Sequence, residues 1–188
     1  MSTSGTSGEV KRRVSPRKTP TRDEKYLGLA LFVAEFSKDP STQHGAHIVS
    51  KDNYPLGYGY NGPPKEIDDL NMNWDRPEKY SVINHAEYNA IMHSDRDRME
   101  GATIYATGKP CPACMLKIIT YGIKRVVYLD DSKMHDAGSM CVNASSSQET
   151  ENLAKMGGVQ LVPFVGDLNW IRDRVLWLGS MGVFSNSE

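Results

Sequence analysis

Between residues 84 and 164 the sequence alternates short helical segments with short apolar segments, and this alternation limits the fold more than any other feature. The predicted helices are residues 85–94, 111–122 and 146–157, and the predicted strands are residues 101–108, 123–130 and 159–164. Ser146 or Ser147 is the expected cap of the last of these helices. Strands that alternate with helices in this way build a sheet covered by helices.

The first half of the chain adds one helix and two strands to this pattern. Leu27, Leu31 and Ala34 recur at helical spacing in residues 23–38, and acidic residues stand in the first turn, where the helix dipole favours them. The additional strands are expected at residues 44–51 and 55–62. Residues 63–80 are polar and predict a long surface loop that carries function. The complete pattern predicts an α/β fold, a three-layer α/β/α sandwich around a five-stranded mixed sheet.

The length of 188 residues suits one domain with tails. We expect a disordered basic tail at residues 1–22, a globular domain at residues 23–168, and a C-terminal helix and tail at residues 169–188. The chain has neither an apolar run of about 18 residues, as a membrane span needs, nor a signal-peptide pattern. The sequence therefore predicts a soluble, cytoplasmic protein without a membrane partner.

The net charge of −1 hides an uneven distribution. Residues 1–22 hold six basic side chains and one acidic side chain, so this tail carries +5 and the rest of the chain −6. Nucleic-acid affinity depends largely on neutralising phosphates, so an acidic body makes a nucleic-acid partner improbable for the domain. The basic tail leaves open a nuclear-targeting or nucleic-acid-contacting role for that segment alone.

Cysteine usage indicates metal chemistry more than disulfide bonding. The three cysteines, Cys111, Cys114 and Cys141, are too few for a disulfide framework in a chain of this length. Cys111 and Cys114 form a C-x-x-C pair on the expected first turn of a helix. Taken alone, such a pair is compatible with a redox centre, half of a structural zinc site, or part of a catalytic metal site.

The segment His85-Ala86-Glu87 separates these alternatives. A catalytic zinc site keeps three protein ligands and one open position, and His85 supplies a third ligand beside the two cysteines. Glu87 is placed to act as a general acid and base, and H-x-E followed by P-C-x-x-C is the pattern of zinc nucleobase deaminases. A redox pair leaves His85 and Glu87 unexplained. A closed structural site needs a fourth ligand, for which the candidates are Cys141, His135 and His93, and none of these stands in a second paired motif.

Over residues 25–165 the sequence resembles the deoxycytidylate (dCMP) deaminases of the cytidine-deaminase superfamily. The resemblance rests on the segments SKDPSTQHGAHIVS, GYGYNGPP, HAEYNAI and GIKRVVYLDD, in addition to the zinc motif. It implies that His85, Cys111 and Cys114 bind Zn2+ and that Glu87 shuttles protons. The extended HAEYNAI motif and the SKDP segment distinguish this family from tRNA adenosine deaminases, which share only the zinc core.

The resemblance also implies substrate-binding residues. Asn61 matches the asparagine that contacts the sugar hydroxyl, and the alternative is an ordinary turn residue before a glycine. Ser37 and Lys38 lie where the family's segment borders the nucleotide phosphate, and the alternative is a solvated helix end. Tyr128 is a candidate for the base pocket, or else a buried strand tyrosine.

Three positions depart from the family pattern. Lys109 stands where an apolar side chain usually precedes P-C-x-x-C, so it places a flexible cation near the expected pocket mouth. His44 and His47 replace small or apolar residues. Each is expected to be an ordinary surface or core histidine, with a second metal site as the alternative.

The expected function is zinc-dependent deamination of dCMP to dUMP, which supplies dUMP for dTMP synthesis in pyrimidine metabolism. Deamination of dCTP or of a 5-modified dCMP, a nucleic-acid-editing deaminase and a non-catalytic zinc module remain alternatives. The resemblance implies a homo-oligomer, often a hexamer, and regulation by dCTP as activator and dTTP as inhibitor together with Mg2+.

Overall fold

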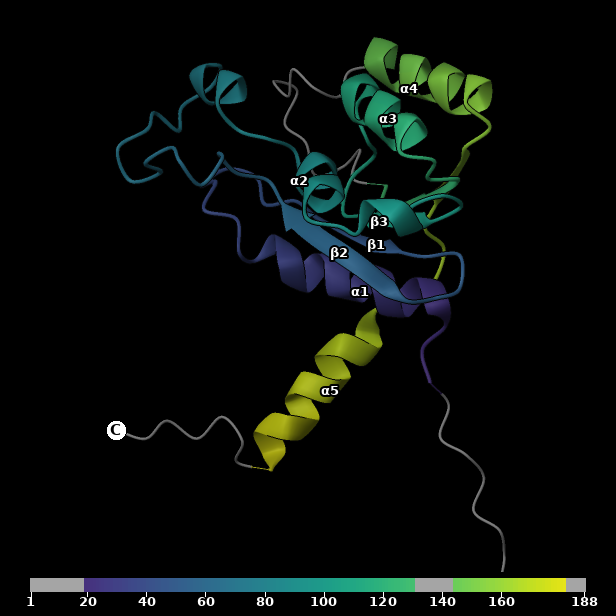
Figure 1. The fold of residues 1–188 in the computed structure, drawn as a ribbon. Helices are drawn as coiled ribbons and strands as arrows, with labels where there is room; N and C mark the ends of the chain where they lie inside the picture. Colours follow the sequence, from purple (N-terminus) through teal and green to yellow (C-terminus); the bar gives the residue numbers. More distant parts are fainter. Residues whose placement is uncertain (1–18, 131–143, 182–188) are drawn as a thin grey trace, which may run out of the picture.

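The computed structural model describes residues 19–130 and 144–181, with a five-stranded mixed sheet at its centre (Figure 1). The strands are β1 (Gly45–Val49), β2 (Pro55–Tyr60), β3 (Thr103–Ala106), β4 (Arg125–Tyr128) and β5 (Gln160–Pro163), in the spatial order β2-β1-β3-β4-β5. β1 runs antiparallel to both β2 and β3, whereas β3, β4 and β5 are parallel. The crossover connections between the parallel strands carry helices, as the alternating sequence predicts.

Helices cover both faces of this sheet. They are α1 (Arg22–Ala34), α2 (Ala86–Met92), α3 (Pro112–Thr120), α4 (Ala144–Met156) and α5 (Asn169–Ser180), with short 3-10 helices at Glu78–Ser81 and Arg96–Arg98. α2, α3 and α4 lie on one face, α1 lies on the other, and α5 extends away beyond α1 (Figure 1). The predicted three-layer α/β/α sandwich and its five-stranded mixed sheet are confirmed.

Strand alternation divides the buried side chains into two cores. Ala46 and Ile48 of β1 belong to the larger core, which α2, α3 and α4 cover. Val49, two residues after His47 on the same strand, belongs to a smaller core that Tyr26 and Leu27 of α1 complete. Successive strand residues point to opposite faces of a sheet, so each strand contributes to both cores.

Two glycines, one on each of the neighbouring strands β1 and β2, let helices approach the sheet closely. Gly59 of β2 lies so near α2 that an added Cβ atom would overlap the backbone at Asn89 and Ala90. A Cβ atom at Gly45 of β1 would overlap the carbonyl of Ala30 in α1. The absence of side chains at these positions therefore sets the height of both helices above the strands, including the helix that follows His85.

Helix ends depart from the predictions at two places. α1 begins with a capping box in which Thr21 and Glu24 each bond the other's backbone N–H, and it ends at Ala34, before the predicted end at residue 38. α4 begins at Ala144, so the assignment of Ser146 or Ser147 as its cap was wrong. Both serines lie inside the first turns of the helix instead.

The tails are described only in part. Of the predicted basic tail, only its last four residues belong to the described chain, and α5 falls within the predicted C-terminal segment. None of the described helices combines the length and apolar character that crossing a membrane requires.

Candidate active site

Two helix starts on the same face of the sheet bring the predicted metal ligands together. His85 occupies the cap position of α2 and Cys111 that of α3, both with extended backbone. Pro112 follows at the first helical position, where its missing N–H has no intrahelical partner to lose. Cys114 lies in the first turn of the same helix and is buried. Two separate segments thus meet through the packing of their helices.

The distances between these side chains suit a small metal ion. Nδ1 of His85 lies 3.5 Å from the sulfur of Cys111 and 3.5 Å from the sulfur of Cys114. All three ligand atoms lie within 4.8 Å of one another. Zinc bonds of about 2.3 Å to sulfur and about 2.1 Å to nitrogen at a tetrahedral angle would separate the two ligands by ~3.6 Å. The donor set and its spacing therefore fit zinc.

The two thiols differ in acidity. The pKa of Cys111 is lowered to about 4 because Cys114 hydrogen-bonds to its sulfur and His85 lies beside it. The pKa of Cys114 is raised by the same hydrogen bond and by burial. The pair thus favours one thiolate at neutral pH, and thiolate is the form of cysteine that binds metals.

Glu87 lies beside the three ligands and is 8% exposed. Burial raises the pKa of this carboxyl group, whereas the neighbouring His85 opposes the shift. Glu87 and His85 belong to the wall of one pocket, which Cys111 also lines. A carboxyl group in this position can exchange protons with a molecule bound in the pocket.

The pocket opens between the helix starts, the loop before β1 and the loop before α2. Its empty volume is about 690 Å³, including solvent at the mouth. Besides the residues already described, its lining includes Asp39, Thr42, His44, Asn61, Arg76, Lys79, Tyr80, Ile83, Thr107 and Lys109. The candidate metal ligands His85 and Cys111, the carboxyl group of Glu87 and these polar side chains therefore share one opening.

Asn61 is the predicted substrate-binding residue that lines this pocket. Its side-chain oxygen accepts a hydrogen bond of 2.7 Å from the backbone N–H of His44. Its amide nitrogen donates to the carbonyl of Thr42 at 3.0 Å and to Asp39 at 3.4 Å. Since an amide oxygen can accept two hydrogen bonds, Asn61 keeps capacity for one more donor.

The structure places the other three predicted substrate-binding residues outside the pocket lining. The Ser37 hydroxyl donates to the carbonyl of Asn61 at 2.8 Å, so it braces the strand end that carries Asn61. Lys38 forms an exposed ion pair with Asp69 at 2.6 Å. Tyr128 is half-buried at the end of β4, with the Lys109 ammonium 5.9 Å from its ring centroid.

Sequence reasoning missed a buried ion pair in the pocket wall. Lys79 and Asp39 each have side chains only 1% exposed, and Nζ of Lys79 lies 2.7 Å from both carboxylate oxygens. The same carboxylate accepts the backbone N–H groups of Ser41 and Thr42. Lys79 lies in the segment predicted as a surface loop, and no local pattern marks a buried lysine whose partner is forty positions away.

Lys109, the flexible cation predicted near the pocket mouth, has partners on α4. Lys109 bonds Glu151 at 2.6 Å and Ser147 at 2.7 Å, both on α4. The Thr150 hydroxyl, also on α4, donates to the carbonyl of Pro110 at 3.0 Å. α4 therefore fastens the loop that leads into Cys111.

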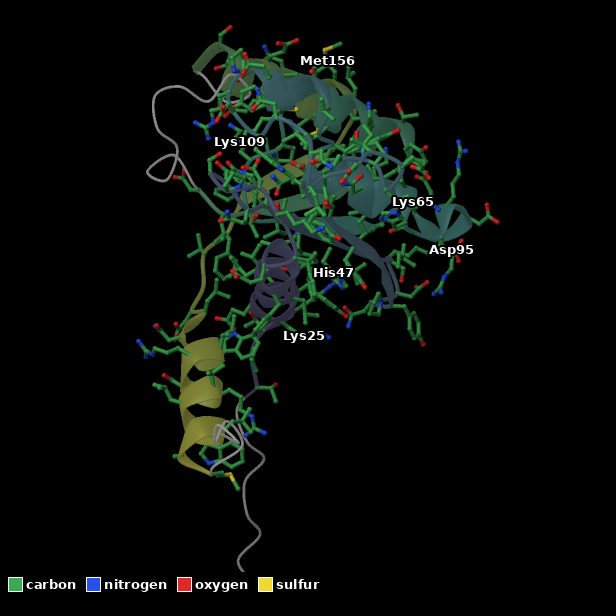
Figure 2. The ribbon with its side chains drawn as sticks, turned by 90° about the vertical axis from the view of Figure 1, so that its left-hand side faces the viewer. Lys25, His47, Lys65, Asp95, Lys109 and Met156 are labelled. Carbon is green, nitrogen blue, oxygen red and sulfur yellow. The ribbon has the colours of Figure 1, made fainter. Side chains whose placement is uncertain are left out.

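The other described histidines, His44, His47 and His93, do not join the metal group. His44 lines the pocket with Nδ1 3.2 Å from the Thr107 hydroxyl, whereas His47 is buried on the α1 side of the sheet (Figure 2). Within residues 19–130 and 144–181, His85, Cys111 and Cys114 form the one cluster spaced for a metal ion. The other candidate ligands, Cys141 and His135, lie outside the described residues.

An α/β/α sandwich that presents one histidine and two cysteines at neighbouring helix starts, beside a buried glutamate, has the arrangement of the nucleobase deaminases. Comparison with protein families agrees with this class. The family model described as the cytidine and deoxycytidylate deaminase zinc-binding region matches residues 20–130. The chain belongs to this family.

Individual relatives support the same assignment. The chain is 39% identical over 120 residues to the deoxycytidylate deaminase of Mus musculus, a match that covers 61% of this chain and 67% of the relative. It is 35% identical over 126 residues to that of Mycobacterium phage D29, covering 60% and 98%. The crystal structure of dCMP deaminase from the cyanophage S-TIM5 in complex with dCMP and dUMP shares the fold, with a TM-score of 0.54 and 23% identity over 79% of this chain and all of that chain.

Proposed function

We propose that the chain converts dCMP to dUMP and ammonia by hydrolysis, with zinc held by His85, Cys111 and Cys114. The observation that carries this proposal is the convergence of these three ligand atoms within 4.8 Å, beside the buried Glu87. Relatives named deoxycytidylate deaminases support dCMP as the substrate. So does the related cyanophage structure with dCMP and dUMP.

Zinc bound at this site would lower the pKa of a water molecule to about 7 and so supply a nucleophile at neutral pH. Glu87 accepts a proton from the attacking water and delivers it to N3 of the cytosine ring. It then carries the second proton to the amine at C4, which leaves as ammonia, while the water oxygen remains on C4. The carboxylate ends in its starting state, as general acid and base catalysis requires.

The chain binds the rest of the nucleotide through polar groups in the same pocket. The free lone pair of the Asn61 side-chain oxygen accepts the sugar hydroxyl. Ser37 and Lys38 remain candidates for contact with the phosphate, and Tyr128 for contact with the base. None of these three residues lines the pocket in its observed position.

Family resemblance extends the proposal to regulation and assembly. We propose a cytoplasmic homo-oligomer, with a hexamer as the expected state. Activation by dCTP and inhibition by dTTP, each with Mg2+, complete the proposal. Sedimentation of the zinc-loaded chain and activity measured with each effector test these points separately.

The direct test of the reaction is ammonia release by zinc-loaded protein from dCMP, dCTP, 5-methyl-dCMP and a cytosine-containing single strand. Turnover of dCMP in clear preference supports the proposal. Turnover of dCTP alone, or of 5-methyl-dCMP alone, would identify that nucleotide as the substrate and leave the class of reaction unchanged. Turnover of the single strand alone replaces the proposal with a nucleic-acid-editing activity, and the basic tail becomes the segment to delete.

Metal content tests the site itself. We expect one zinc per chain by atomic emission, with loss of zinc in the Cys111→Ser variant. Glu87→Gln should retain zinc and lose turnover, because its carboxyl group is not one of the three ligands. Zinc binding without turnover of any substrate would instead indicate a non-catalytic zinc module.

A further inference from the structure

Three cationic side chains line the pocket, but two of them are already neutralised. The Lys79 ammonium directs its three donors at the two oxygens of Asp39 and the hydroxyl of Ser41. Lys109 is paired with Glu151. Neither ammonium is available for a strong new contact with an anion unless an existing ion pair breaks.

Arg76 is the third cation, and its partners are neutral. Its guanidinium donates to the hydroxyl of Thr42 at 3.0 Å and to that of Ser41 at 3.4 Å. Among residues 19–130 and 144–181, no carboxylate lies within ion-pair distance of Arg76. A guanidinium has five N–H donors, so most of its hydrogen-bonding capacity faces solvent at the pocket.

A hydrogen-bond network sets the position of Arg76 relative to Asn61. The hydroxyl of Thr42 accepts from Arg76, and the carbonyl of the same residue accepts from the Asn61 amide. Asp39 also bonds both the Asn61 amide and Ser41. Thr42 therefore bonds both Asn61, the predicted sugar contact, and Arg76, which has no acidic partner among the described residues.

We propose that Arg76 binds the 5′-phosphate of a nucleoside monophosphate and so makes the pocket select nucleotides over nucleosides. This inference rests on the proposed function. The 5′ substituent of a sugar whose hydroxyl meets Asn61 has to leave the pocket past a neighbouring part of its rim, and Arg76 stands on the rim next to Asn61. A phosphate dianion matches the planar fork of guanidinium donors, which accounts for the use of arginine here.

The structure favours Arg76 over Lys38 for this role. Lys38 already neutralises Asp69, its side chain is 63% exposed, and it does not line the pocket. Arg76 lines the pocket and lacks an acidic partner among the described residues. Arg76 and Lys38 are thus the two competing candidates for contact with the phosphate group.

The test compares inhibition by dUMP and by deoxyuridine, which differ only in the phosphate, in zinc-loaded protein turning over dCMP. In Arg76→Gln we expect the inhibition constant of dUMP to rise about 10- to 100-fold, the usual effect of losing a charge-assisted contact. The inhibition constant of deoxyuridine should stay unchanged. Arg76→Lys should recover part of the loss, because it keeps the charge but not the fork.

Lys65→Gln is the matched control, since Lys65 is an exposed cation in the same loop and lies outside the pocket lining. It should leave both constants unchanged. Equal weakening of both inhibitors in Arg76→Gln would show a structural role and overturn the inference. An unchanged dUMP constant, or a selective loss in Lys38→Gln instead, overturns it as well. Absence of dCMP turnover in the unmodified chain would reject the proposed function, a result distinct from all of these.

Discussion

Two ion pairs on opposite sides of the sheet show how differently the two regions use charge. Lys79 and Asp39, in the pocket wall, have side chains that are 1% exposed. Arg125 and Asp23, on the α1 side, are 29% and 32% exposed, and the guanidinium makes two bonds of 2.7 and 2.8 Å to the carboxylate. The first pair is enclosed by the protein, and the second lies at the edge of a core.

The difference follows from what each region surrounds. On the α1 side the core is filled by rings, with Tyr26 stacked on His47 and tilted against Tyr105, so charge is confined to the edge. On the pocket side the buried carboxylate holds the Asn61 amide as well as Lys79. Burying such a pair adds little net stability, so we infer that it is there to position pocket groups.

The first prediction has the largest expected effect and compares the two regions by how a substitution in each changes kcat. Glu87→Gln removes the proton shuttle and should lower kcat for dCMP by at least about a thousandfold, within the range for loss of a general acid and base. Tyr105→Phe, on the α1 side, removes only a hydroxyl that donates to Asp23 at 2.9 Å. It should keep kcat within about twofold of the original value, as that hydroxyl is far from the chemistry.

Steady-state kinetics at saturating dCMP, with zinc content and melting temperature measured for each variant, make this comparison. Tyr105→Phe also shows how much kcat responds to a general loss of stability. If Glu87→Gln kept more than a tenth of the activity at full zinc occupancy, the proton-transfer role of Glu87 would be wrong.

The second prediction compares the two ion pairs by stability. Lys79→Met leaves the Asp39 carboxylate buried without its countercharge and should lower the free energy of unfolding by about 3–5 kcal/mol. Arg125→Met breaks a partly exposed pair and should lower it by no more than about 1 kcal/mol. Urea denaturation followed by circular dichroism measures both.

A double variant sharpens this result. Adding Asp39→Asn to Lys79→Met removes the unpaired charge and should recover part of the lost stability. It should not recover dCMP affinity if the pair positions Asn61. Equal destabilisation by Lys79→Met and Arg125→Met would show that burial does not distinguish the two pairs.

The same contrast explains which parts of the site the sequence could predict. The candidate ligands His85, Cys111 and Cys114 and the candidate acid Glu87 stand in two short motifs at helix starts. Local spacing was therefore enough to select them, and the structure brings the three candidate ligands together. Strand and helix order followed from periodicity, and the fold prediction was confirmed. Such features are encoded within a few neighbouring residues.

Groups held by long-range contacts could not be found in this way. Lysines are usually exposed, so nothing near Lys79 indicated a buried side chain paired with Asp39. Lys109 was expected to be a flexible cation at the pocket mouth, and its bonds to Ser147 and Glu151 join positions 38 and 42 residues apart, which local patterns do not reveal. The end of α1 was also misplaced, since the turn at Ser37 is stabilised by the distant carbonyl of Asn61.

The third prediction concerns the contact between α4 and the loop before Cys111. Thr150 is fully buried, and Thr150→Val leaves the Pro110 carbonyl without its hydroxyl donor. We expect a loss of about 1–2 kcal/mol in unfolding free energy and a measurable rise in KM, because the carbonyl belongs to the loop that lines the pocket. Thr120→Val is the matched control, since that hydroxyl is exposed and bonds a carbonyl of its own helix. Equal losses in the two variants would remove any special role for the α4 contact.

The smallest effect is expected on the α1 side and depends on pH. His47 is 6% exposed, and neither of its ring nitrogens has a hydrogen-bond partner among the residues that the structure describes. Burial lowers its pKa to about 4, with a further contribution from Lys25. Between this value and the ordinary pKa of about 6.5, the unfolded chain binds a proton that the folded chain does not. The free energy of unfolding is therefore unaffected by protonation of His47 above pH 6.5, and it decreases as the pH falls from 6.5 toward 4.

Replacing His47 with leucine removes this proton linkage and keeps an apolar side chain between Tyr26 and the strand. The melting temperatures of the original chain and the His47→Leu variant should agree within about two degrees at pH 7.5. At pH 5 the variant should melt a few degrees higher, since only the original chain then loses stability to protonation of its unfolded state. Because His47 lies across the sheet from the candidate metal ligands, kcat for dCMP should not change at either pH. A constant difference in melting temperature across this range would mean that His47 takes up its proton at the same pH in the folded and the unfolded chain, and that packing alone decides its contribution.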